Sequence, residues 1–121
     1  MKYYIGLSDR TGKKDVSGKV LELVGPCSDI VGIYTNDEGE TYKEQSVLSN
    51  RQLPIRLVKQ ILRETDQECA LGVRGDGSCS FVYQDSHYSS LTDDGKLIKT
   101  DKEPDAENYS YDGSFYYYIG E

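Results

Sequence analysis

The hydrophobic positions of this chain follow a two-residue period along much of its length, which predicts strands. In residues 2–7, for example, Tyr3, Ile5 and Leu7 share one face of an extended segment. Residues 16–24 are nearly continuous in apolar side chains, and we interpret them as a second strand. Further strands are predicted over residues 29–35, 40–45, 68–73, 78–84, 96–100 and 114–119. The first two of these segments, and likewise the next two, are separated by short turns and should form hairpins.

Only residues 49–65 show the 3.6-residue period of an amphipathic helix. Ser49 or Asn50 would cap its start, and Pro54 fits the first turn, where a missing amide hydrogen costs no helical hydrogen bond. The apolar face comprises Ile55, Val58, Ile61 and Leu62. The chain is therefore predicted to be a single α+β domain over residues 1–121, with one amphipathic helix packed on an antiparallel sheet of hairpins and a meander.

The dipeptide Asp-Gly occurs three times, at Asp76-Gly77, Asp94-Gly95 and Asp112-Gly113, eighteen residues apart each time. Asp-Gly is a strong signal for a tight turn, because glycine adopts the positive φ that such turns need. Each pair precedes a strand-like segment, so the spacing predicts three turns of a β-meander. The acidic residues 101–111 contain a proline and are predicted to be a loop or a single helical turn.

Net charge and cysteine content indicate which class of partner and which cellular compartment to expect. The net charge is −7, and an acidic surface disfavours nucleic-acid backbones and anionic membranes, because phosphate binding relies on Lys and Arg. Such a surface favours a basic partner protein. Three cysteines are an odd number, no secretory signal is recognisable, and no segment approaches the roughly 20 apolar residues of a membrane span. We therefore expect the reducing cytoplasm.

The segment Arg74-Gly75-Asp76-Gly77-Ser78-Cys79 resembles the nucleophile motif of the ovarian-tumour cysteine deubiquitinases, in which Asp-Gly-x-Cys opens the catalytic helix. The resemblance implies a cysteine hydrolase with Cys79 at a helix N-terminus, where the thiolate is stabilised. The family's catalytic histidine lies far downstream of the cysteine, whereas the only histidine here, His87, is eight residues on. Residues 80–83 also favour a strand over a helix. A hairpin turn followed by a half-buried cysteine explains the same residues, and no catalytic site is predicted.

No metal site or cofactor site is predicted either. One histidine and three scattered cysteines lack the paired spacing of a zinc site. Asp93-Asp94-Gly95 has a calcium-like composition but does not continue into the ligand pattern of an EF-hand loop. No glycine-rich loop suited to phosphate is present. The sequence thus favours a binding protein over an enzyme.

The leading hypothesis is a small acidic inhibitor or immunity-type factor, of the kind carried by phages and mobile elements, that blocks a basic nuclease, toxin or defence effector. Carboxylates interleaved with tyrosines can occupy a basic cleft, because tyrosine supplies contact area at low entropic cost and the electric field steers encounter. The predicted partner-binding residues are Asp101, Glu103, Asp105, Glu107, Tyr109 and Tyr111. A homodimer would also cover exposed strand edges.

The rival hypothesis is a phage-type sponge that sequesters a small anionic ligand such as a nucleotide signal. Residues 45–63 contain no acid but several basic residues, and guanidinium groups pair well with phosphate. Arg56, Lys59 and Arg63 would hold the phosphate. Phe81 or Tyr83 would stack on the base.

Overall fold

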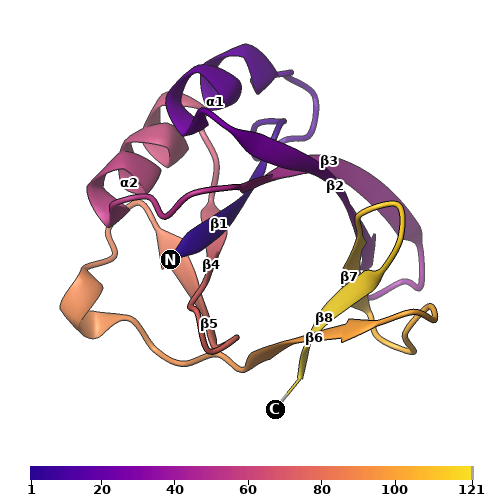
Figure 1. Cartoon of the computed structure of the whole chain (residues 1–121). Helices are drawn as coiled ribbons and strands as arrows, with labels where there is room; N and C mark the ends of the chain where they lie inside the picture. Colours follow the sequence, from indigo (N-terminus) through magenta and orange to yellow (C-terminus); the bar gives the residue numbers. More distant parts are fainter. Residues whose placement is uncertain (121) are drawn as a thin grey trace.

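The computed structural model describes residues 1–120, and its eight strands curl into one nearly closed barrel (Figure 1). All strand pairs are antiparallel, and the order across the sheet is β5-β4-β1-β3-β2-β7-β8-β6. The strands are β1 (Lys2–Gly6), β2 (Cys27–Thr35), β3 (Thr41–Ser49), β4 (Cys69–Val73), β5 (Cys79–Tyr83), β6 (Lys96–Thr100), β7 (Asn108–Tyr111) and β8 (Tyr116–Gly120). The helices are α1 (Ser17–Val24), α2 (Ile55–Glu64) and the short 3-10 helix η1 (Tyr88–Ser90).

The two edge strands, β5 and β6, meet at a seam that closes the ring. The Cys79 amide donates to the Gly95 carbonyl, the Asp94 amide to the Cys79 carbonyl, and the Leu97 amide to the Gly77 carbonyl, each at 2.8 Å. The Asp94 carboxylate extends the seam by accepting the Phe81 amide at 2.9 Å. The edges that suggested a homodimer are therefore bonded to each other where the two strands begin, between residues 77–81 and 94–97.

Two helices cover the outer face of β1, β3, β4 and β5, and the hydrophobic core lies between them and the sheet (Figure 1). The sheet contributes Tyr3, Ile5, Val47, Ala70 and Val82. The helices contribute Val20, Val24, Val58, Ile61 and Leu62. Within residues 1–120, neither helix has the length and apolar content needed to cross a membrane.

The predicted α+β class is wrong, because the described residues are 42% strand and 18% helix and two short helices accompany a barrel. The main local error is residues 16–24, which form α1 and not a strand. Val20 and Val24 are one helical turn apart and both fully buried, whereas Leu21 is 44% exposed. A run of apolar residues without a clear period fits either element, and here contact with α2 decides for the helix.

The predicted helix over residues 49–65 is confirmed only as the shorter α2, and its predicted caps are wrong. Ser49 is the last residue of β3, and its hydroxyl accepts the Tyr3 amide at 2.9 Å. Pro54 occupies the N-cap position in extended conformation, with no side-chain cap. The polar segment between β3 and α2 thus crosses from the sheet to the helix without a capping residue.

The hairpins β2–β3 and β4–β5 confirm two predictions, but the C-terminal meander is wrong. Residues 108–111, predicted as a loop, form β7 and pair with β2. Strand β8 lies between β7 and β6, so β6 does not pair with the strand that follows it. Asp76-Gly77 and Asp112-Gly113 turn true hairpins, whereas Asp94-Gly95 belongs to the seam.

Candidate functional site

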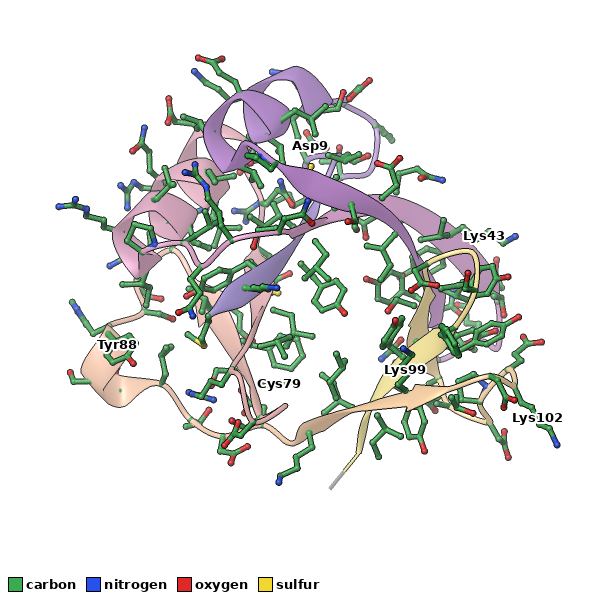
Figure 2. All side chains as sticks on the ribbon, in the orientation of Figure 1. Asp9, Lys43, Cys79, Tyr88, Lys99 and Lys102 are labelled. Carbon is green, nitrogen blue, oxygen red and sulfur yellow. The ribbon has the colours of Figure 1, made fainter. Side chains whose placement is uncertain are left out.

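The inner face of the barrel surrounds an open cavity of about 940 Å³. Along each strand every second residue faces inward, and register partners share a face, so Gly32 and its partners Glu44 and Ser110 all line the cavity. Figure 2 looks along the ring and shows side chains directed into it, while Lys43 and Lys102 point outwards. Apolar side chains on five strands line the cavity: Ile30, Leu71, Phe81, Leu97 and Ile119, with Phe81 39% exposed.

Two glycines make room for polar groups inside the cavity. A Cβ on Gly32 would lie 2.7 Å from the Tyr34 hydroxyl, because the Tyr34 side chain lies across this glycine. A Cβ on Gly6 would lie 2.7 Å from Glu44 Oε1 and 2.8 Å from Gln67 Oε1. Larger residues at either position would displace these groups, since real Cβ atoms do not approach so closely.

Tyrosines supply aromatic surface to the same cavity. The Tyr34 and Tyr42 rings lie 5.8 Å apart between centroids, tilted by 33°. Burial, together with the Glu44 carboxylate, raises the pKa of Tyr34 to about 12. Burial also raises the pKa of Tyr4, and the neighbouring phenol of Tyr117, which lines the same cavity, adds to this shift. These phenols are therefore neutral hydrogen-bonding groups at physiological pH.

Glu44 is the acidic group held inside the barrel, between Tyr42 and Ser46 on the inward side of β3. It is half-buried, and burial raises the pKa of its carboxyl above the ordinary value. The ion pairs of residues 1–120 are Arg10–Asp66 and Lys19–Glu64, so no cation of this part of the chain neutralises it. The Glu44 carboxylate makes no hydrogen bond within the described residues, and no side-chain N or O atom there is both buried and without a partner, so its oxygens are open to the cavity.

The loop after β1 frames one mouth of the cavity. Its backbone is fixed by the Arg10 amide, which donates to the Asp66 carbonyl at 2.8 Å. The Arg10 Nε also lies 3.0 Å from the Asp66 carboxylate. The positive charge of Arg10 at this mouth is therefore already paired.

The predicted partner-binding residues lie in the β6–β7 connection and on β7, and of these Tyr109 is also among the residues that line the cavity. The four acids are exposed, and the Tyr109 hydroxyl donates to Glu103. Tyr111 stacks on Tyr116 at 4.5 Å, and Tyr109 contacts the same ring edge-on at 5.9 Å. We call Tyr109, Tyr111 and Tyr116 the outer tyrosine face. Glu103 thus contacts the outer tyrosine face, and the other three acids lie in the same connection between β6 and β7: Asp101, Asp105 and Glu107.

The predicted phosphate and base contacts are not brought together. Arg56, Lys59 and Arg63 lie on α2, which packs outside the sheet through its apolar face. Phe81 and Tyr83 alternate with the helix-facing residue Val82, so they face the other side of β5. The sheet separates the two groups.

The cysteine that resembles a nucleophile is the first residue of a strand, β5, and not of a helix. Cys79 is 0% exposed, and burial raises the pKa of its thiol, which opposes thiolate formation. His87 precedes η1, on the connection that carries the labelled Tyr88 outside the ring (Figure 2). Within residues 1–120 no group of three or more His, Cys, Asp or Glu side chains is arranged to hold a metal ion.

The cavity residues Tyr4, Tyr34 and Glu44 were missed by sequence reasoning. One signal was available, because glycine in a strand interior often marks a close approach, and Gly6 and Gly32 each sit in a strand. Which face of each strand would point inward depends on barrel closure, which no local pattern reveals. No protein-family model, curated protein or solved structure matches this chain.

Proposed function

We propose that this protein is a non-enzymatic binding protein that holds a small molecule with an apolar or aromatic body inside its barrel. The observation that carries the proposal is the cavity of about 940 Å³ in an eight-stranded ring. Eight strands enclose an interior wide enough for one small ligand, and ligand pockets typically measure roughly 300–1,000 Å³. The free cysteines Cys27, Cys69 and Cys79 are consistent with a reducing cytoplasm as its compartment.

The lining supports a ligand of this class. Ligand pockets are mostly apolar, with a few polar groups that fix orientation. Leu71 and Phe81 are register partners that provide apolar surface. Tyr34, Tyr42 and Glu44 provide a small polar set on β2 and β3. The proposal keeps the small-ligand class of the sponge hypothesis but not its phosphate grip, because the basic side chains of α2 lie outside the barrel.

The test is binding of N-phenyl-1-naphthylamine, a neutral dye whose fluorescence rises in apolar pockets. The wild type should bind the dye at micromolar concentrations, and Leu71→Trp should weaken binding at least tenfold by filling the cavity. Leu21→Trp is the control, because Leu21 is exposed on α1, outside the barrel. Equal binding by both variants would contradict the proposal, and circular dichroism would check that each variant is folded.

A second candidate function is the blocking of a basic partner protein by the outer tyrosine face and its neighbouring acids. The specific observation is that neither helix packs on β7 or β8, so this aromatic surface stays open. The double variant Asp105→Lys with Glu107→Lys should abolish recovery of the partner in pull-down experiments. The control is Asp37→Lys with Glu38→Lys, the same charge change in the exposed β2–β3 turn. Equal recovery with both double variants would contradict this function.

A further inference from the structure

The half-buried Glu44 carboxylate is the starting point, because it lies inside an aromatic cavity without an internal counter-ion among residues 1–120. Glu44 and Tyr42 point inward from the same strand, and Tyr34 is the register partner of Tyr42. The carboxylate therefore has two aromatic rings beside it and open cavity in front of it. Negative charge next to ring faces is the arrangement that attracts an organic cation.

Among residues 1–120 no cation lies within ion-pair distance of Glu44. Lys99, the register partner of the cavity residue Tyr117, has its Nζ over the Phe115 ring, 4.0 Å from the ring centre. From β2 it faces the Tyr34 phenol, and from β4 the Cys69 thiol, both of which are neutral at physiological pH because their pKa values are raised. The Gln67 amide lies beside it over Gly6. Lys43, its neighbour in sequence, points to the outside of the ring (Figure 2). Arg10 at the mouth is paired with Asp66.

We propose that the ligand is an amine with an aromatic or apolar body, whose ammonium group pairs with Glu44 while Tyr34 and Tyr42 pack on it. This inference rests on the proposed function and adds the charge of the ligand. An anionic ligand would meet Glu44 as a like charge in a partly desolvated space, which is unfavourable. A neutral ligand would leave the carboxylate unpaired. The net charge of −7 further favours the approach of cations.

The test compares three indoles that differ in one group: tryptamine with an ammonium, tryptophol with a hydroxyl and indole-3-acetate with a carboxylate. Each competes with N-phenyl-1-naphthylamine for the wild-type protein. Tryptamine should displace the dye at least roughly tenfold better than tryptophol, because charge-assisted hydrogen bonds are the stronger kind and tenfold is a typical loss for one. Indole-3-acetate should be the weakest. This comparison needs no variant, so it does not depend on the folding of one.

Two variants then test whether Glu44 is the carboxylate that pairs with the ammonium group. In Glu44→Gln the preference for tryptamine over tryptophol should fall to about twofold or less, with dye binding retained. Glu68→Gln removes the same charge from a residue that lines the cavity at its exposed rim, and it should keep the preference. Equal displacement of the dye by tryptamine and tryptophol, or a preference for tryptamine that survives in Glu44→Gln, would overturn the inference. In either case, dye binding by the wild type would still support the proposed function. Failure of the wild type to bind the dye would overturn both.

Discussion

The Val20→Asp variant is expected to lose at least about 4 kcal/mol of its free energy of unfolding, because an unpaired charge in a dry core typically costs several kcal/mol. Val20 is 0% exposed and belongs to the core between the helices and the sheet. Domains of this kind have total stabilities of roughly 5–15 kcal/mol, so much of the variant should be unfolded. Urea unfolding followed by circular dichroism measures the change.

Leu21→Asp is the matched control, since it places the same charge one residue further along α1. Leu21 is 44% exposed, so its replacement should change stability by no more than about 1 kcal/mol. Similar losses in the two variants would contradict the helical packing of residues 17–24. The pair therefore tests directly the segment whose secondary structure the hydrophobic pattern predicted wrongly.

The Gly95→Val variant is expected to lose about 3 kcal/mol or more, through backbone strain and overpacking together. Gly95 has a φ of +127°, which side-chain-bearing residues rarely adopt. A Cβ there would also lie 2.6 Å from Ile119 Cγ2 and 2.7 Å from the Gly120 carbonyl oxygen. Because Ile119 and Gly120 belong to β8, the variant must distort the contact between β8 and the residues that lead into β6. The measurement is again the free energy of unfolding in urea.

Gly113→Val separates the two causes. Gly113 has a φ of +99°, but no atom lies within 4 Å of its Cβ position, so only backbone strain applies. This control should lose roughly 1–2 kcal/mol. If Gly95→Val lost no more than Gly113→Val, the close approach of Gly95 to β8 would not contribute to the loss.

The local patterns of the sequence predicted those elements whose packing is set by near neighbours in the chain. The β2–β3 and β4–β5 hairpins follow from alternation and turn residues, and α2 follows from its apolar face. The errors arise where distant contacts decide. Residues 16–24 became a helix because α2 packs against them, and residues 108–111 became a strand because β2 offers hydrogen bonds to them.

The cavity lay beyond sequence reasoning for a related reason. An inward-facing tyrosine and an outward-facing tyrosine have the same local sequence signature, as Tyr117 and Tyr116 in one strand illustrate. Only closure of the sheet makes one side an interior. Among the acids and tyrosines of residues 101–111, the structure shows one hydrogen bond, from the Tyr109 hydroxyl to Glu103, and their role in partner binding stays a prediction.

The order of the strands also determines what a growing chain can build on the ribosome. Strand β2 lies in the middle of the sheet, yet its second neighbour, β7, consists of residues 108–111 near the end of the sequence. Until those residues emerge, the backbone of β2 that later bonds to β7 is an unprotected edge, the kind of surface that joins neighbouring chains. Synthesis of the last few strands thus converts an association-prone intermediate into a ring.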